Sequence, residues 1–179
     1  MTRLEQRYKD QIIPSLMASF DLKNKNAVPK LTKVTINVGF GKANGDKKII
    51  DAVSHTLTRI SGQKPILTKA KKSISNFKLR QGMVIGAMVT LRKDRMYEFV
   101  DKLINVSLPR VRDFQGIKRT AVDQDGNLNI GLKEHLVFPE IKSDGVEHVH
   151  GLEVAITTTA DNQKQGMKLF ELLGIPFKK

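Results

Sequence analysis

The chain has 179 residues, 40% of them hydrophobic, so we expect one domain over residues 1–179 with a sizeable core. It has no cysteine, which excludes disulfides and cysteine-based zinc sites and is compatible with a reducing compartment. Lysine and arginine number 31 against 18 acids, a net charge of +13, which predicts a polyanionic partner. No long apolar span or secretory leader is evident, which favours nucleic acid over membrane and a cytoplasmic location.

The positive charge is concentrated in the N-terminal half. Residues 1–93 carry 19 cations and 5 acids, a net +14, whereas residues 94–179 carry 12 cations and 13 acids, a net −1. No acid occurs in the 42 residues between Asp51 and Asp94. Single lysines usually belong to a solvated face. Because acids would repel a phosphate backbone, a long acid-free stretch instead indicates a surface that faces a polyanion.

The first predicted elements are a helix and a strand. An apolar residue recurs at every fourth position over residues 4–20, which predicts one amphipathic helix, kinked or split by Pro14. Residues 33–40 alternate polar and apolar side chains, which predicts a strand. Ile36 and its apolar neighbours should face a core, and Asn37 and its polar neighbours should face away.

A second helix is predicted over residues 49–60, with Asn44 or Asp46 as its cap and Gly62 beyond its end. The glycine-bearing segment 39–47 precedes this helix, which is where phosphate-binding loops occur. Its spacing lacks the third glycine of a dinucleotide fingerprint and the Gly-Lys-Ser or Gly-Lys-Thr of a P-loop. A tight connection is the favoured interpretation, and a nucleotide site is the alternative.

Two strands, 64–70 and 83–92, are predicted to form a hairpin around a long basic loop, 71–82. Alternate residues of the second strand, including Val89, should face the core. The next apolar pattern, from Met96 to Ile104, predicts an amphipathic helix that Pro109 ends.

The C-terminal part begins with residues 110–151, which we expect to be loops with one or two short strands. A last strand over 152–157 should precede a helix capped by Asp161, stopped at Gly174 and Pro176, and buried through Met167, Phe170 and Leu173. This order predicts an α+β fold: a two-layer, mostly antiparallel sheet of about five strands with helices on one face and a long basic β-hairpin loop.

Catalytic and metal-binding patterns are weak. The segment Glu147-His-Val-His150 could place the imidazoles of His148 and His150 on one side, with His135 as a third ligand, as a candidate metal set. No second motif fixes that geometry, so surface histidines in a polar loop are the favoured interpretation. No nucleophile elbow or paired-carboxylate arrangement stands out, and we expect no enzyme activity, no cofactor and no metal.

If the helices cover the apolar face of the sheet, the opposite face is polar and exposed. Hydroxyls, an amide and cations on rigid strands suit contacts to phosphates and ribose hydroxyls, although an ordinary solvated face is the alternative. Aromatic residues make up only 6% of the chain, which argues against stacking of successive unpaired bases and favours folded RNA. The predicted face comprises Lys33, Thr35, Asn37, Lys64, Thr68, Thr90 and Arg92.

Several segments closely resemble one family, that of the bacterial large-subunit ribosomal protein five. They are 35–39 (TINVG), 61–65 (SGQKP), 68–73 (TKAKKS), 77–82 (FKLRQG) and 151–160 (GLEVAITTTA). Matches at 108–114, 138–141 and 176–179 extend the resemblance over nearly the whole chain. It implies a non-enzymatic component of the central protuberance that binds 5S ribosomal RNA through its sheet, with 23S ribosomal RNA and neighbouring large-subunit proteins as further partners.

The resemblance also implies roles for particular residues. Asn37, Gln63 and Thr90 resemble RNA-recognition positions. The hairpin loop resembles one that reaches transfer RNA in the peptidyl site. Phe77 in this loop could stack on a nucleotide or anchor the loop to the protein itself. The loop positions are Lys71, Lys72, Ser73, Ser75, Asn76, Phe77, Lys78 and Arg80.

A third region resembles a bridge to a small-subunit protein. It contains Arg110, Arg112 and Asp113, together with the loop 142–147. Three hypotheses therefore stand: a ribosomal RNA scaffold, a phosphate-handling enzyme built on 39–47, and a nonspecific DNA-binding protein.

Overall fold

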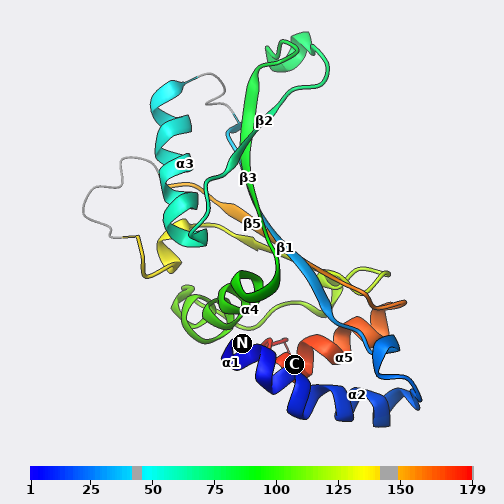
Figure 1. Cartoon of the computed structure of the whole chain (residues 1–179). Helices are drawn as coiled ribbons and strands as arrows, with labels where there is room; N and C mark the ends of the chain where they lie inside the picture. The colour runs from blue at the N-terminus through cyan, green and yellow to red at the C-terminus, as the bar shows by residue number, and fades with distance from the viewer. Residues whose placement is uncertain (42–45, 142–148, 179) are drawn as a thin grey trace. The chain divides into compact units, whose positions relative to one another are not determined.

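The structure is a computed structural model that describes residues 1–41, 46–141 and 149–178 (Figure 1). Its α-helices are α1 (Arg3–Arg7), α2 (Ile13–Phe20), α3 (Lys47–Ser61), α4 (Lys93–Lys102) and α5 (Gln163–Leu173). Its strands are β1 (Leu31–Gly39), β2 (Ile66–Lys69), β3 (Val84–Leu91), β4 (Leu128–Leu132) and β5 (Leu152–Thr158). Across these described ranges, no helix is long and apolar enough to cross a membrane.

The five strands form one sheet in the order β2-β3-β1-β5-β4. The sheet is open and antiparallel, so the predicted α+β class and the mostly antiparallel sheet of about five strands are confirmed. Strands β2 and β3 pair as the predicted hairpin, with Ile66 opposite Met88 and Thr68 opposite Gly86.

The chain divides into two compact units. The first contains Met1–Val34, Leu91–Ile130 and Val154–Lys179, and the second contains Thr35–Thr90 and Gly131–Glu153. The expectation that residues 1–179 form a single domain stays a prediction.

The N-terminal helical run of the first unit is split, as the presence of Pro14 led us to predict. A π-helical turn, Tyr8–Ile12, separates α1 from α2, and Pro14 lies in the first turn of α2. Proline has no amide hydrogen, so it cannot continue the regular ladder, whereas its fixed φ suits a first turn. The predicted apolar stripe is buried at Leu4, Tyr8, Ile12 and Leu16 and half-buried at Phe20.

Tyr8 fixes this helical run to the segment that leads into β1. Its hydroxyl donates a hydrogen bond to the carbonyl of Pro29 at 2.8 Å. Burial raises the pKa of the Tyr8 phenol, and burial also raises the pKa of Tyr97, whose ring lies 6.5 Å from that of Tyr8.

Two helix ends of the first unit differ from the prediction. Pro109 does not end the helix after β3, because α4 continues as a π-helical turn, Leu103–Ser107, and a 3₁₀ turn, Leu108–Arg110. Proline is tolerated there because the first residues of a helical turn need no amide donor. The cap of α5 is Asn162 rather than Asp161, and the Asn162 side chain accepts from the amide of Gln165 at 3.0 Å.

The C-terminal stop of α5 is as predicted, with Gly174 at φ 96°. Its buried side comprises Leu169, Phe170 and Leu173, whereas Met167, predicted to be buried, is only half-buried. The preceding polar region, 110–151, contains the single strand β4 and 3₁₀ turns at Arg119–Ala121 and His135–Val137 among its described residues.

In the second unit, buried and half-buried side chains alternate along β1 and β3. Ile36 and Val38 of β1 are buried, as are Ala87 and Val89 of β3, whereas the residues between them on β1 are half-buried. Helix α3 supplies Val53, Leu57 and Ile60 to the core. Asp46 caps its N-terminus, with its side chain accepting from the amide of Lys48 at 2.9 Å, and Gly62 caps its C-terminus at φ 67°.

Candidate nucleic-acid interface

Thr68 and Thr90 lie on the same face of the β2–β3 hairpin. Thr68 is directly opposite Gly86. Opposite residues of an antiparallel pair point to one side, and every second residue of a strand does the same. Gly86, Met88 and Thr90 therefore share a face with Thr68, away from the buried side chains of Ala87 and Val89.

Gly86 allows the strands to approach closely on this face. A Cβ at position 86 would lie 2.8 Å from the carbonyl oxygen of Val38 and 2.9 Å from Oγ1 of Thr68. Both distances are too short for a carbon atom, so residue 86 has to be glycine for Thr68 to keep its position. The surface between β1 and β2 consequently has no side chain at its centre.

Gln63 joins the same region through a hydrogen bond. Its side-chain Nε2 donates to the carbonyl oxygen of Thr90 at 3.4 Å. The residue follows the αL end of α3 at Gly62, and its amide donates to Oγ of Ser61 at 3.2 Å. Two positions that the resemblance singled out, 27 residues apart in sequence, therefore contact each other.

The remaining predicted face residues differ in exposure. Thr35 and Asn37 are half-buried on β1, between buried apolar neighbours, and Lys64 is exposed just before β2. Lys33 is half-buried and Arg92 is exposed, and both belong to the first unit. The second unit therefore holds six of the eight predicted positions, which are Thr35, Asn37, Gln63, Lys64, Thr68 and Thr90.

Apolar side chains also belong to this face. The alternation over 83–92 predicts this for Met88, beside Thr90, whereas Ile66 was not predicted there. Ile66 lies opposite Met88, on the side of Thr68, and is 69% exposed. Met88 is half-buried. The available signal was the alternation along this segment, since Ile66 lies two residues from both Lys64 and Thr68, which were predicted on this face. The face is therefore mixed, with hydroxyls and an amide beside two apolar side chains.

The hairpin loop has more internal structure than the long loop we predicted. Ile74 and Leu79 exchange main-chain hydrogen bonds of 3.0 and 3.1 Å around a 3₁₀ turn, Ser75–Phe77, and Lys78 adopts φ 52°. The amide of Gln81 donates to Oγ of Ser73 at 2.9 Å. Main-chain bonds thus hold residues 71–82, which we call the hairpin tip.

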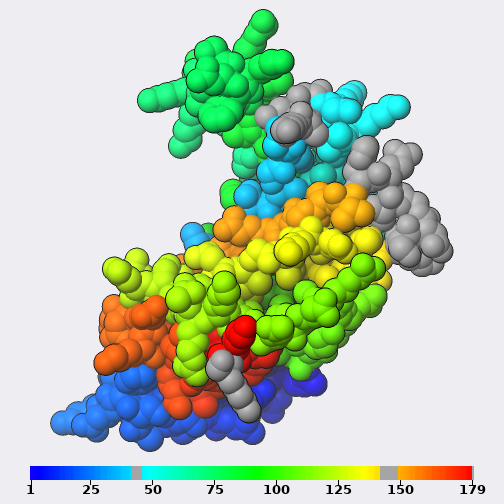
Figure 2. Space-filling model, turned by 180° about the vertical axis from the view of Figure 1, so that it is seen from behind, coloured from blue at the N-terminus to red at the C-terminus, as the bar shows by residue number. Residues whose placement is uncertain are grey.

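All eight predicted tip residues are exposed, including Lys72 and Arg80. Figure 2 shows the tip side chains standing clear of the strands that carry them. Phe77 is 70% exposed, so it does not anchor the tip to the rest of the protein. Of the two interpretations of Phe77, only a ring available for stacking fits this exposure.

The predicted bridge residues lie in the first unit. Arg110 ends the 3₁₀ turn Leu108–Arg110, and Arg112 and Asp113 follow it, with Asp113 at φ 52°. All three are exposed. The accompanying loop, 142–147, lies outside the described residues.

The glycine-bearing segment gives little support to a nucleotide site. Residues 42–45 lie outside the described part of the chain. The amide of Lys48 at the start of α3 is bonded to the carboxylate of Asp46, and this carboxylate would repel a phosphate at the same place.

The candidate metal set also changes with the structure. His135 is buried and not a surface residue, and it stacks on His150 with ring centroids 4.0 Å apart and planes at 15°. Glu147 and His148 lie outside the described residues. Within the ranges that are described, no group of three or more His, Cys, Asp or Glu side chains could hold a metal. Its burial was missed because residues 110–151 were interpreted as a polar loop region, although the apolar run 136–138 follows His135 directly.

Comparison with known proteins shows the family to which this chain belongs. A family model described as "Ribosomal protein L5" matches residues 24–80, and a second model, which describes the C-terminus of the same ribosomal family, matches residues 84–177. The chain belongs to the ribosomal protein L5 family. Family membership confirms the resemblance seen in segments such as 35–39 and 77–82.

Full-length relatives of the L5 family agree. The chain is 51% identical over 177 residues to a protein of Halothermothrix orenii and 52% identical over 178 residues to one of Herpetosiphon aurantiacus, covering 99% of both chains in each case. It is 51% identical over 179 residues, 100% of both chains, to one of Caldanaerobacter subterraneus subsp. tengcongensis. Each relative is named "Large ribosomal subunit protein uL5". The L5 family is one of ribosomal proteins, not of enzymes, as expected from the absence of a catalytic motif.

Proposed function

We propose that this chain is a structural constituent of the large subunit of the bacterial ribosome, in the cytoplasm, and that its polar sheet face binds 5S ribosomal RNA. Its relatives carry the name of a large-subunit protein over their full length. The 42-residue acid-free stretch between Asp51 and Asp94 includes β2 and β3, so the hairpin presents no carboxylate to a phosphate backbone.

The chemistry of the face suits a folded RNA. Half-buried hydroxyls of Thr68 and Thr90 sit on paired strands and have fixed directions, so they match ribose hydroxyls and phosphates at set positions. Ile66 and Met88 offer apolar contact to ribose carbons on the same side. RNA helices are read largely by the shape of their minor groove, which a rigid and mixed surface of this kind complements.

The observation that carries this proposal is the contact between Gln63 and Thr90. A hydrogen bond from the glutamine amide to the β3 main chain leaves its carbonyl oxygen and second hydrogen for a ligand. Thr90 is beside it, half-buried on the face of Thr68. Polar groups that are oriented before binding favour specific recognition over loose attraction by charge.

A second proposal concerns the hairpin tip. We propose that it contacts transfer RNA in the peptidyl site through exposed cations such as Lys72 and Arg80 and through the ring of Phe77. A cation near a phosphate and an aromatic ring on a nucleotide plane are the two usual components of contact with exposed RNA. The main-chain bonds between Ile74 and Leu79 keep the ring away from the protein core.

Further contacts complete the proposed assembly. Arg110, Arg112 and Asp113 are proposed to bridge to a small-subunit protein, together with 142–147. Their exposure in the first unit is compatible with a partner. Contacts with 23S ribosomal RNA and with neighbouring large-subunit proteins are proposed as well. No cofactor and no metal take part in this proposed function.

The decisive experiment compares RNA affinities of the full chain at one salt concentration. The dissociation constant for 5S ribosomal RNA should be lower than that for an arbitrary RNA duplex of equal length by on the order of a thousandfold, as in specific protein–nucleic acid complexes. Filter binding at several salt concentrations then separates the shared phosphate contribution from the specific one.

Competing functions predict other results. Equal affinity for 5S RNA and for the duplex would contradict the scaffold, and equal affinity for double-stranded DNA would favour a nonspecific DNA-binding protein. Saturable nucleotide binding that Gly41→Ala or Lys47→Ala abolishes would revive the enzyme hypothesis.

A further inference from the structure

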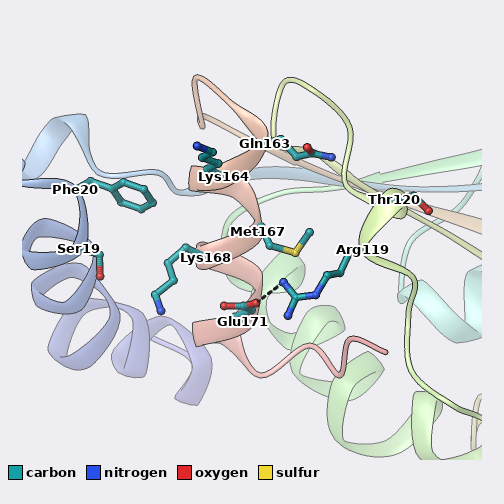
Figure 3. A pocket seen from close by; sticks show the side chains of 9 residues that line it. All are labelled: Ser19, Phe20, Arg119, Thr120, Gln163, Lys164, Met167, Lys168 and Glu171. Carbon is teal, nitrogen blue, oxygen red and sulfur yellow. Dashed lines mark ion pairs between the residues drawn. The ribbon is translucent and has the colours of Figure 1, made fainter. Parts of the chain in front are cut away.

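An open groove of about 790 Å³ runs over the outer side of α5 in the first unit (Figure 3). The C-terminal end of α2 forms one wall, and the segment at Arg119 and Thr120 forms the other. The floor is the face of α5 that carries Lys164, Met167 and Lys168.

The floor has the spacing of a helix contact face. Residues 164, 167, 168 and 171 follow the i, i+3, i+4, i+7 pattern, by which a helix presents one stripe to a neighbour. Met167 and, on α2, Phe20 are half-buried and supply apolar surface. Methionine adapts its shape and is frequent on surfaces that receive peptides. This stripe of α5 therefore has the spacing of a helix contact face, but it lines an open groove.

The charge around the groove is positive and only partly compensated. Nη1 of Arg119 lies 3.1 Å from Oε1 of Glu171, which is the only acid that lines the groove among the described residues. Figure 3 shows Lys164 and Lys168 on the side of α5 toward α2. Neither lysine has an ion-pair partner within the described part of the chain. This cationic site lies in the half of the sequence whose net charge is −1, so it does not belong to the basic N-terminal half.

The apolar and cationic side chains of the groove together indicate which kind of partner fits it. The β2–β3 hairpin, which we propose to bind RNA, carries no carboxylate, whereas the carboxylate of Glu171 lines this groove and would repel a continuous phosphate backbone. A peptide with carboxylates and an apolar side chain satisfies both kinds of group, because the apolar atoms leave water while the carboxylates approach the lysines.

We propose that this groove docks an acidic segment of another protein. Its carboxylates lie at Lys164 and Lys168, and one of its apolar side chains packs on Met167. The interaction goes beyond the proposed RNA binding and does not depend on it, since none of these residues belongs to the sheet face or the hairpin tip.

A first experiment measures peptide affinity with the full chain. The probe is a fluorescein-labelled synthetic peptide in which pairs of Glu alternate with single Leu residues, followed by fluorescence anisotropy at roughly 0.1 M salt, where the Debye length is about 10 Å. Lys164→Glu combined with Lys168→Glu should raise its dissociation constant about tenfold or more, because two attractions become repulsions.

The matched control changes the same charge elsewhere. Lys47→Glu with Lys48→Glu alters two exposed lysines at the start of α3, where acids suit the helix dipole, and should leave the dissociation constant within about twofold. A peptide with Ser in place of Leu should bind several-fold more weakly to the unaltered chain, and Met167→Gln should remove that difference. Equal weakening by both lysine pairs, or equal binding of the Leu and Ser peptides, would overturn the proposal.

A second experiment asks what occupies the groove in the ribosome. A benzophenone amino acid replaces Met167 in the full chain, and intact ribosomes are irradiated. Mass spectrometry should identify a cross-linked segment of another ribosomal protein that is rich in Asp and Glu, and Lys164→Glu with Lys168→Glu should abolish that cross-link. Cross-linking to ribosomal RNA, to a segment without acids, or to nothing would overturn the proposal.

Discussion

The β2–β3 part of the sheet face and the hairpin tip belong to one acid-free stretch, between Asp51 and Asp94, but present their side chains in different ways. On the face, Thr68, Thr90 and Gln63 are half-buried, and their positions depend on neighbours such as Gly86. On the tip, every predicted contact residue is exposed, and mainly main-chain bonds hold the shape. From this difference we expect the proposed RNA contact of the face to depend on a fixed shape, and that of the tip to depend on charge and one aromatic ring.

Replacing Gly86 should have the largest effect. In Gly86→Ala the new Cβ would meet the Val38 carbonyl and Thr68 Oγ1 at less than 3 Å, so β1 or Thr68 has to move. We expect the free energy of unfolding to fall by about 2 kcal/mol, as for other overpacked sites, and 5S RNA affinity to fall with it. Urea denaturation and filter binding measure the two quantities.

The matched control for this change is Gly131→Ala on β4. Gly131 has no atom within 4 Å of an added Cβ and does not have positive φ. Its unfolding free energy should stay within about 0.5 kcal/mol of the unaltered chain. Equal stabilities of the two variants would contradict the close approach inferred at Gly86.

Asn37→Ala and Thr90→Val test the face directly. Each should weaken 5S RNA binding by about 2 kcal/mol, roughly thirtyfold in the dissociation constant, because a group that bonds a charged or polar RNA atom is lost. Circular dichroism should show an unchanged fold, since neither side chain is buried in the core. Unchanged affinity in both variants would show that RNA binds another surface.

Tyr8→Phe changes a position outside both regions and tests whether stability alone alters binding. Loss of the hydrogen bond to Pro29 should lower the free energy of unfolding by about 1 kcal/mol near neutral pH, with RNA affinities unchanged. Burial raises the pKa of the Tyr8 phenol above the usual value near 10. The folded state therefore favours the protonated phenol, so its stabilisation is complete below about pH 10 and is lost as pH rises further.

Thermal unfolding midpoints between neutral and alkaline pH check this expectation. The decline above about pH 10 should be shallower in Tyr8→Phe, with the remainder due to Tyr97, whose pKa burial also raises. An identical decline in both proteins would contradict the role of Tyr8.

Changes at the tip should have the smallest effect on free energy but a distinct dependence on salt. Lys72→Ala and Arg80→Ala should each weaken transfer RNA contact in assembled ribosomes and reduce the slope of log affinity against log salt by about 0.7 to 0.9. Their 5S RNA affinity should match that of the unaltered chain. A strong loss of 5S binding would instead assign the tip to the same interface as the face.

The sequence predicted those parts that follow from local periodicity. Alternation over 33–40 and 83–92 identified the buried sides of β1 and β3, because side chains of a strand point to opposite faces regardless of distant contacts. The interior of the tip escaped prediction, because the bonds between Ile74 and Leu79 are made by the main chain. The left-handed Lys78 also lacks the glycine that usually marks such a position.

Other differences arose from choices between equivalent residues or from tertiary packing. Asp161 and Asn162 are both good helix caps, so the sequence alone did not distinguish them. His135 lies between Lys133-Glu134 and the apolar run 136–138, and the structure buries it in a stack on His150. The candidate face was predicted through its polar residues, and Ile66, which alternates with Lys64 and Thr68, was left out of it.

The main-chain bonds of the tip also bear on how freely its sequence can vary. A shape that depends on amides and carbonyls is insensitive to which side chains occupy positions 75–77, provided that Lys78 keeps its left-handed conformation. Substitutions at positions 75–77 should therefore alter the proposed transfer RNA contact without altering the main-chain shape of the tip. A fluorophore attached at position 76 would thus report on the proposed transfer RNA contact from a tip whose main-chain shape it leaves unchanged.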